Sequence, residues 1–311
     1  MYCVSDFFLN YNTIINIMEK IRGIYAAGLS ILDENLALNV EKTIKHAEML
    51  IDQGCHGTAI FGSTGQAQLL PISEKIKLLN MLSKSKYKDK HIIGTGLNSL
   101  NETINFLKIA STLNFKKFLI MPPAYYKYED NEVIEFYSKI IKSVPESKII
   151  LYNFEKLCGY EFSIDCVEKL VKKFPDQIIG IKDSTYNLFE EIKLKNFSIF
   201  PGSEKKLLKG LQLGCSGIIT ATCNVTAELS RRVYDDFISG KEQKYNKKLC
   251  DIRSVFDKYN LISGLHSFYS QENESYENIL PPLRLLKEDE KRDLIKNLSE
   301  LNFKLKPEKA A

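Results

Sequence analysis

Short apolar runs alternate with longer amphipathic stretches along most of the chain. The runs are rich in β-branched and aromatic residues, as strands are, and they span residues 21–30, 57–62, 91–96, 117–122, 148–153, 178–184, 197–202 and 216–222. The stretches between them carry apolar residues at helical spacing, over 39–53, 73–84, 100–113, 131–143, 163–173, 204–213 and 225–238, with a short turn or helix near 186–194. Strands that alternate with helices in this way predict a parallel sheet covered by helices.

The number of these units points to one architecture within the α/β class. Eight strand–helix units over residues 21–239 match the size of a (β/α)8 TIM barrel. A doubly wound open sheet is the alternative, but it usually carries a glycine-rich loop after its first strand, and Gly28-Leu29-Ser30 lacks that fingerprint. We therefore predict a barrel.

Two further segments flank the predicted barrel. Residues 1–20 are polar-interrupted and predict an N-terminal tail, with Met18 as an alternative start. Residues 240–311 predict a C-terminal helical region, with an apolar-periodic segment at 242–262 and a last helix near 288–303.

Polar residues and glycines mark the ends of several predicted helices. Ser73 and Asn101, each followed by a glutamate, are the expected N-caps of two helices. Gly54 and Gly214 stand where the end of a helix favours a left-handed residue.

Composition excludes several classes of protein. The chain has 43 Lys and Arg against 39 Asp and Glu, interleaved rather than in blocks, so we expect neither a nucleic-acid partner nor a membrane surface. Its apolar runs are far shorter than the roughly 20 residues of a membrane span. Seven scattered cysteines without a C-x-x-C pair are typical of free thiols in the cytoplasm.

The residues after the predicted strands carry the candidate chemistry, because a barrel builds its active site at the carboxyl ends of its strands. Lys182 follows the apolar run 178–181. A lysine amine among apolar walls suits Schiff-base chemistry with a ketone, since loss of water favours the neutral nucleophile. The structural alternative to a catalytic role is that Lys182 extends from the strand end into solvent or pairs with Asp183.

Hydroxyl groups on neighbouring strand ends strengthen the case for catalysis. Tyr152 ends the strand before that of Lys182, and a phenol there can move protons to and from a carbinolamine oxygen. Tyr125 and Tyr126 follow the strand before that, and Ser63 can relay protons between two phenols.

Metal-dependent chemistry has little support in the sequence. A metal-dependent barrel aldolase needs a cluster of ligands, whereas the four histidines, at 46, 56, 91 and 266, are scattered over predicted helices, turns and a strand start. We predict no metal.

Five motifs in this order resemble the dihydrodipicolinate synthase and N-acetylneuraminate lyase family of pyruvate-dependent class I aldolases, over residues 21–300. The motifs are GSTG at 62–65, PPAYY at 122–126, YN at 152–153, GIKDS at 180–184 and GCSGIITATCNV at 214–225. The resemblance implies a (β/α)8 barrel with a C-terminal helical region, a homotetramer built from tight dimers, and no cofactor.

The resemblance also implies roles for single residues. Lys182 matches the Schiff-base lysine, Tyr152 the proton-relay tyrosine and Ser63 the hydroxyl of the relay. Tyr126 resembles the tyrosine that crosses a dimer interface, although Tyr125 is an alternative for that role.

The substrate contacts follow from the same resemblance. Thr64 matches the residue that holds the pyruvate carboxylate, and Ile219 the residue whose backbone carbonyl borders pyruvate. Gly202 and Glu204 stand where family members contact the second substrate.

Departures from the family pattern bear on the substrate. Synthases read Y-N-x-P-x-R, with the arginine on the carboxylate of the aldehyde substrate, but this chain has Leu157 in place of the arginine and Glu155 in place of the proline. Lys156 offers only a point charge without the planar fork of arginine, and Gln66 replaces a frequent glutamate. We therefore expect a lyase or aldolase acting on a 2-keto-3-deoxy sugar acid or a related 2-oxo acid. Condensation of pyruvate with aspartate semialdehyde, and 2-oxo acid binding without turnover, are the alternatives.

Overall fold

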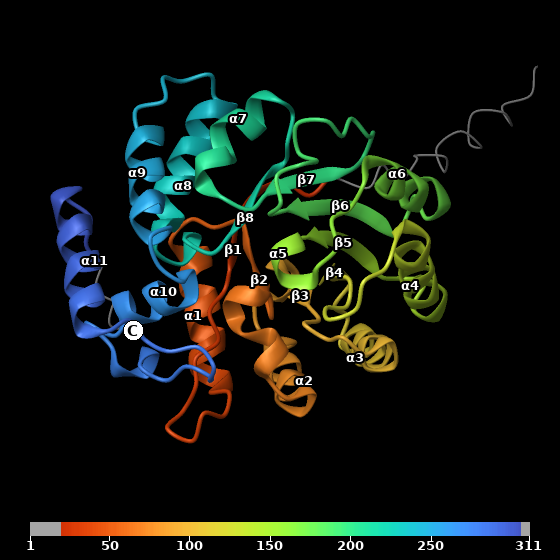
Figure 1. Cartoon of the computed structure of the whole chain (residues 1–311), viewed down its shortest axis with the longest axis horizontal. Coiled ribbons are helices and arrows are strands. Elements are labelled where there is room, and N and C mark those ends of the chain that lie inside the picture. The colour runs from red at the N-terminus through yellow and green to blue at the C-terminus, as the bar shows by residue number, and fades with distance from the viewer. Residues whose placement is uncertain (1–19, 306–311) are drawn as a thin grey trace, which may run out of the picture.

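Eight parallel strands form a single sheet in the computed structural model, which describes residues 20–305 (Figure 1). The strands are β1 (Gly23–Ala27), β2 (Gly57–Ile60), β3 (His91–Gly94), β4 (Lys117–Ile120), β5 (Lys148–Asn153), β6 (Ile178–Asp183), β7 (Ser198–Pro201) and β8 (Gly217–Thr220). Their order is β7-β6-β5-β4-β3-β2-β1-β8, so each strand lies beside its sequence neighbours. The N–H of Ser216 donates to the carbonyl of Ile199 at 2.8 Å and bridges the remaining gap between β7 and β8. The predicted (β/α)8 barrel is confirmed, and the open-sheet alternative is wrong.

Helices follow the strands around the outside of the barrel. They are α1 (Val40–Asp52), α2 (Ile72–Leu82), α3 (Leu100–Thr112), α4 (Asp130–Ser143), α6 (Ile164–Lys173), α7 (Leu207–Gln212) and α8 (Cys223–Ile238). The predicted segment near 186–194 is a turn rather than a helix. A short helix, α5 (Glu155–Cys158), follows β5 where the sequence predicted neither a strand nor a helix. The predicted tail and the alternative start at Met18 lie outside the described residues.

The barrel interior holds its own apolar core. Side chains that alternate along the strands meet inside the sheet, and the buried ones are Tyr25, Ala59, Ile92, Leu119, Ile150, Tyr152, Ile179, Phe200 and Ile219. Tyr25 on β1 and Phe200 on β7 contact edge to face at 5.7 Å between ring centroids. The opposite faces of the strands pack against the surrounding helices in a second, larger cluster.

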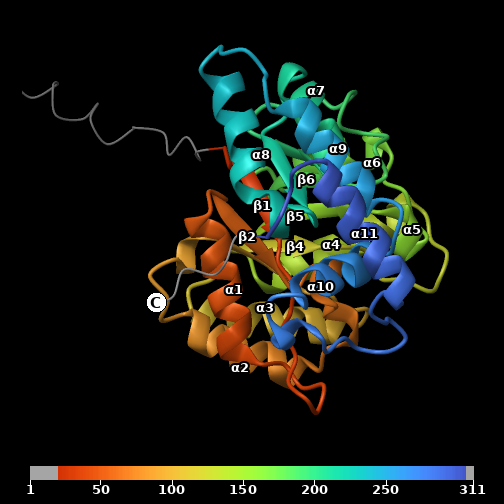
Figure 2. The same cartoon turned by 90° about the vertical axis from the view of Figure 1, so that its left-hand side faces the viewer.

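The C-terminal helical region consists of α9 (Asn246–Phe256), α10 (Leu261–Tyr269) and α11 (Glu288–Glu300). The segment 242–262 is therefore not continuous: the chain turns at 257–260, and the Asn260 side chain accepts from the N–H of Ile262 at 3.0 Å to start α10. α9 lies beside α8 and α10 beside α1, whereas α11 packs on the outer side of α9 and α10 (Figures 1 and 2). Their apolar side chains bury Leu29 and Ala221, which follow β1 and β8. The region thus packs against the carboxyl end of the barrel.

The predicted ends of the helices were partly right. Gly54 and Gly214 follow α1 and α7 with φ of +119° and +89°, as expected of left-handed residues. Ser73 is not an N-cap, because α2 already begins at Ile72 after Pro71. Asn101 is not one either: the hydroxyl of Ser99, just before the first apolar residue of α3, accepts from the N–H of Glu102 at 3.3 Å.

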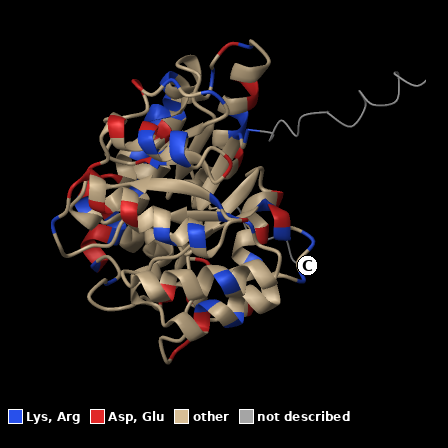
Figure 3. Ribbon diagram, turned by 90° about the vertical axis from the view of Figure 1, so that its right-hand side faces the viewer, with Lys and Arg blue, Asp and Glu red and all other residues tan. Residues whose placement is uncertain are grey.

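Charged residues of both signs are dispersed over the ribbon (Figure 3). Within residues 20–305, no helix is both long enough and apolar enough to span a membrane. The cysteines in this range are free thiols, at positions 55, 158, 166, 215, 223 and 250.

Candidate active site

A β-bulge in β6 points Lys182 into the barrel. The register of β6 against β5 shifts by one residue after Ile178, so that Ile150 pairs with Gly180 and Tyr152 with Lys182. Ile178 and Ile181 pack in the outer cluster, whereas Ile179 packs in the interior. Strict alternation from Ile179 would send the side chain of Lys182 outward, and the extra residue reverses that.

Gly180 makes the bulge possible at this tightly packed position. A Cβ at Gly180 would lie 2.4 Å from the carbonyl oxygen of Ser198 on β7. Only a residue without a side chain allows β6 and β7 to approach this closely. The GIK part of the GIKDS motif therefore has a direct role in aiming Lys182.

The Lys182 amine lies against the ring of Tyr152, and the residue is 3% exposed. It pairs in register with Tyr152 on one side and Phe200 on the other, and its Nζ lies 4.2 Å from the centroid of the Tyr152 ring. No hydrogen bond or ion pair to this amine forms among residues 20–305. No carboxylate or carbonyl oxygen of the described residues therefore accepts from its N–H groups.

Asp183, the structural alternative as a partner of Lys182, faces the other way. Its fully buried carboxylate accepts from Asn153 Nδ2 at 2.9 Å and from the N–H groups of Tyr186, Leu188 and Phe189 at 2.8–3.0 Å. These four donors satisfy the buried charge and shape the loop after β6. The lysine–aspartate pair of that alternative therefore does not form.

The phenol of Tyr152 meets the hydroxyl of Ser63. Their oxygens lie 3.0 Å apart, so a hydrogen bond joins the ends of β5 and β2. Ser63 begins a 3-10 turn, η1 (Ser63–Gly65), and Gly65 is required there because a Cβ would lie 2.9 Å from the Gly28 carbonyl oxygen. The hydroxyl of Ser30 donates to the carbonyl of Gly65 at 2.6 Å and fixes the turn.

The same turn leaves polar groups available for an anion. The N–H groups of Ser63 and Thr64, and the Thr64 hydroxyl, donate to no acceptor in the described part of the chain. Gln66 follows in the left-handed region, and its side-chain oxygen accepts from the N–H of Leu280 at 2.8 Å. A segment of the C-terminal helical region therefore supports this turn from outside the barrel.

Tyr126 and Tyr125 do not join the Ser63–Tyr152 pair within this chain. They are 73% and 90% exposed and contact each other edge to face at 5.2 Å between centroids. Tyr125 also adopts φ of +90°, which is rare for a residue with a side chain. Both tyrosines thus project from the loop after β4.

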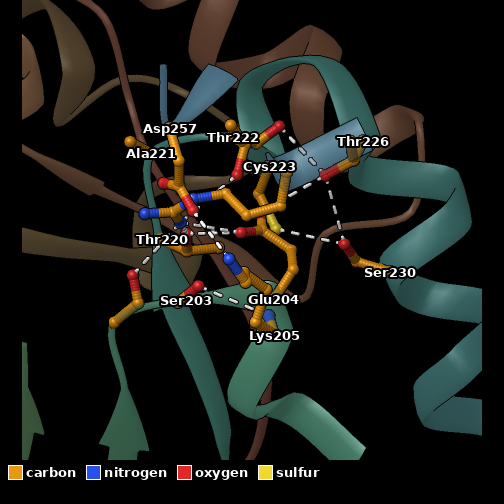
Figure 4. Close-up of polar contacts among 12 residues, drawn as sticks. Ser203, Glu204, Lys205, Thr220, Ala221, Thr222, Cys223, Thr226, Ser230 and Asp257 are labelled. Carbon is orange, nitrogen blue, oxygen red and sulfur yellow. Dashed lines mark hydrogen bonds and ion pairs between the residues drawn. The ribbon is translucent and has the colours of Figure 1, made fainter. Parts of the chain in front are cut away.

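In the Gly202–Glu204 turn after β7, the side chain of Glu204 does not face a substrate as expected but points into the protein. Glu204 is fully buried, and its carboxylate binds inside the protein to Thr220 Oγ1 at 2.9 Å and Thr226 Oγ1 at 3.4 Å. Nη1 of Arg253 from α9 donates to it at 2.9 Å (Figure 4). The side chain of Ile219, predicted to border pyruvate through its carbonyl, packs in the barrel interior.

Arg253 is the main residue of this area that the sequence analysis missed. Burial opposes its charge, but Glu204 and Asp257 outweigh burial and hold its pKa above the ordinary value. Arg253 interrupts the buried apolar residues Leu249, Ile252, Val255 and Phe256 of α9, and it lies four residues before Asp257. An arginine on the apolar face of an amphipathic helix is a signal that was available in the sequence.

The loop after β5 presents no arginine. Leu157 is 42% exposed on α5, and Lys156 beside it is also exposed. Phe154 instead packs its ring against Tyr152, at 6.2 Å between centroids.

Residues 20–305 contain no group of three or more His, Cys, Asp or Glu that could hold a metal ion. Two of the histidines bond inside the protein: His91 Nδ1 to Thr58 Oγ1 at 2.8 Å, and His46 Nε2 to Asn224 Oδ1 at 2.8 Å. Burial lowers the pKa of both to about 4, which suits structural imidazoles.

Known proteins resemble the chain over most of its length. A sequence profile of the Dihydrodipicolinate synthetase family matches residues 20–301. The N-acetylneuraminate lyase of Clostridium perfringens is 30% identical over 222 residues, which is 69% of this chain and 75% of that protein. The 4-hydroxy-tetrahydrodipicolinate synthase of a Hydrogenobaculum species is 32% identical over 183 residues, 57% of this chain and 62% of that protein. The crystal structure of dihydrodipicolinate synthase from Agrobacterium tumefaciens has a TM-score of 0.81 at 20% identity, over 90% of this chain and 99% of that one.

Proposed function

Because the chain belongs to the dihydrodipicolinate synthetase family, we propose that it is a class I aldolase that cleaves or forms a 2-keto-3-deoxy sugar acid through a Schiff base at Lys182. Family membership makes it an enzyme of the lyase type with pyruvate as a substrate or product. The observation that carries the proposal is the row of Lys182, Tyr152 and Ser63, three polar groups from β6, β5 and η1 at one end of the barrel.

The proposed chemistry begins at the amine. Nζ of Lys182 attacks the C2 ketone of the sugar acid, the carbonyl oxygen leaves as water, and an iminium forms. Tyr152 supplies and removes the protons of these steps, and Ser63 passes them along the 3.0 Å hydrogen bond.

The iminium then accepts the electron pair of the C3–C4 bond. C4 leaves as an aldehyde when its hydroxyl loses a proton, and the enamine takes a proton at C3. Hydrolysis releases pyruvate and restores the amine. The free N–H groups of η1 and the hydroxyl of Thr64 suit the carboxylate beside C2. No metal or organic cofactor is needed in this scheme.

The choice of a sugar acid as substrate rests on the absence of an arginine after β5. Recognition of the carboxylate of aspartate semialdehyde calls for a cationic fork, and the position carries Leu157. N-acetylneuraminate, named in the 30% identical relative, is itself a 2-keto-3-deoxy sugar acid.

A panel of substrates tests this proposal. The purified protein should release pyruvate from 2-keto-3-deoxygluconate or N-acetylneuraminate, and Tyr152→Phe should slow release by about 10²–10⁴-fold. Pyruvate plus aspartate semialdehyde is the matched control and should give no product. Product from that pair alone would make the protein a synthase, and pyruvate binding without turnover of any pair would make it a binding protein.

We extend the proposal to the assembly. Exposed Tyr125 and Tyr126 suit burial against a second copy of the chain, where Tyr126 can complete the proton relay, and we propose the homotetramer expected of the family. Tyr126→Ala should then lower both the native mass and turnover. A cytoplasmic location stays a prediction from the cysteine content.

A further inference from the structure

The turn after β7 lies beside the reactive end of the barrel. Phe200 is the register partner of Lys182, so residues 202–204 follow just beyond the level of the amine. The N–H of Gly202 donates to the carbonyl of Asp183 at 2.9 Å, and a Cβ on Gly202 would lie 2.3 Å from Ser184 Oγ. The turn therefore borders the two residues that follow Lys182.

An ion-pair cluster anchors this turn from outside the barrel. Besides Glu204, Nη1 of Arg253 donates to Thr220 Oγ1 at 3.0 Å and approaches the Gly202 carbonyl at 3.5 Å. Nε of Arg253 donates to Asp257 at 2.7 Å, and Lys205 pairs with the same aspartate at 3.3 Å (Figure 4). One arginine thus ties α9 to the ends of both β7 and β8.

The charges within the cluster balance. Two cations, Arg253 and Lys205, face two carboxylates, Glu204 and Asp257. No net positive charge is left for an anionic ligand, and the Glu204 oxygens are occupied by protein donors. The cluster is therefore suited to holding backbone in place rather than to binding substrate itself.

We propose that Arg253 is a positioning residue for the second-substrate side of the active site. It fixes the Gly202–Glu204 turn, so the C-terminal helical region sets the affinity for the part of the substrate beyond C3 while the chemistry at Lys182 proceeds without it. The inference rests on the proposed function for its kinetic consequence, whereas its structural consequence is independent of the substrate.

Two variants and one control test this role. Arg253→Leu removes the anchor, and Arg253→Leu with Glu204→Leu removes the anchor without leaving a buried carboxylate unpaired. Arg284→Leu is the control, because Arg284 pairs with Glu290 at 3.0 Å on the exposed surface of the same region, with 57% of its side chain exposed.

Hydrogen exchange gives the readout that needs no substrate. Amides of residues 202–206 should exchange faster in both variants, while those of residues 62–66 keep the wild-type rate, and Arg284→Leu should change neither. Unchanged exchange at 202–206 in the double variant would overturn the proposal.

Kinetics separates positioning from general structural damage. Deuterium exchange of the pyruvate methyl group, which needs only the Schiff base, should stay within about threefold of wild type in Arg253→Leu. In the same Arg253→Leu variant, KM for 2-keto-3-deoxygluconate should rise about tenfold with little change in kcat. The KM of Arg253→Lys should lie between those of wild type and Arg253→Leu. Equal loss of both activities in a folded variant would contradict the role.

The two proposals fail in different ways. Wild-type protein that exchanges the pyruvate methyl group but cleaves no sugar acid contradicts the proposed substrate, and the amide exchange at 202–206 then decides the role of Arg253. Wild-type protein without pyruvate exchange contradicts the proposed function as a whole.

Discussion

The two sides of the barrel's carboxyl end use polar residues in opposite ways. On the β2–β5–β6 side, Lys182 has no hydrogen-bond partner among the described residues, and Ser63 and Tyr152 bond to each other. On the β7–β8 side, Glu204 and Arg253 are buried as well, but their polar atoms bind within the protein. Groups with bonding capacity to spare are placed for chemistry, whereas satisfied groups fix the geometry around them.

The contrast also appears in what supports each side. The bulge at Gly180 aims Lys182 from within the sheet itself. The turn after β7 depends on α9, which lies outside the barrel. Variants on the first side should therefore impair turnover more than folding, and variants on the second side should do the reverse.

The largest expected effect is a loss of turnover on replacing one of two buried lysines, Lys182, but not the other, Lys75. Lys182→Ala should lower turnover by on the order of 10⁴-fold or more and leave the protein folded, because the nucleophile is lost while no hydrogen bond or ion pair of the described residues is broken. Lys75, which is fully buried and donates to the carbonyl of Thr95 at 2.8 Å, is the matched control. Lys75→Met should keep the ability to bind pyruvate covalently. Wild-type turnover in folded Lys182→Ala would remove the distinction between the two lysines.

The next effect concerns stability on the β7–β8 side. Glu204→Leu removes one of the two carboxylates that pair with buried Arg253, which keeps only Asp257, and should lower the free energy of unfolding by about 3–5 kcal/mol. Replacing Glu204 and Arg253 together by leucine should recover most of that loss, because no buried charge remains unpaired. Urea unfolding at neutral pH measures both values. Equal losses in the single and double variants would show that the pair does not act as a unit.

Acid should lower the free energy of unfolding through His46, which bonds to Asn224 of α8. Its Nε2 donates to Asn224 Oδ1 and its Nδ1 accepts from Tyr276, and burial lowers its pKa from 6.5 to about 4. Between those values the unfolded chain binds a proton that the folded chain does not. The stabilisation is therefore present above pH 6.5 and is lost as the pH falls, by up to about 3 kcal/mol at pH 4.

Unfolding in urea at pH 7 and pH 4.5 measures this loss. His46→Gln should show a smaller difference between the two pH values than wild type. Some dependence should remain, because burial also lowers the pKa of His56, His91 and His266 to about 4. Identical differences in variant and wild type would exclude His46 as a source.

The smallest effect tests the bulge. Gly180→Ala should cost about 1–3 kcal/mol of stability, since its Cβ would force β6 away from Ser198. It should also slow adduct formation at Lys182. Gly28→Ala is the control, because apart from its two chain neighbours no atom of residues 20–305 lies within 4 Å of a Cβ at that position. Wild-type stability and adduct formation in Gly180→Ala would show that the bulge tolerates a side chain.

The sequence predicted the strands and singled out Lys182 as a candidate because both inferences depend on local pattern. Apolar runs define the strands, and Lys182 ends one of them. The side to which Lys182 points was not predictable, because the run 178–181 is apolar on both faces and hides the extra residue of the bulge. The N-caps predicted at Ser73 and Asn101 were each two residues too late, since Pro71 and Ser99 occupy the N-cap positions instead.

Long-range polar contacts were beyond the sequence for a different reason. Glu204 and Arg253 are 49 residues apart, and the residues around either one do not indicate that the other is its partner. Glu204 was therefore expected at the substrate, whereas the structure places its carboxylate against Arg253 and two threonines. The same limit applies to Gln66 and Leu280, which meet across 214 residues.

Borohydride reduction in the presence of pyruvate, followed by intact-mass and peptide mapping, tests the central claim most directly. The account predicts one reduced pyruvate adduct per chain, on Lys182, with none in Lys182→Ala and an undiminished yield in Lys75→Met. A folded wild-type protein that forms no adduct, or an adduct on another lysine, would contradict it.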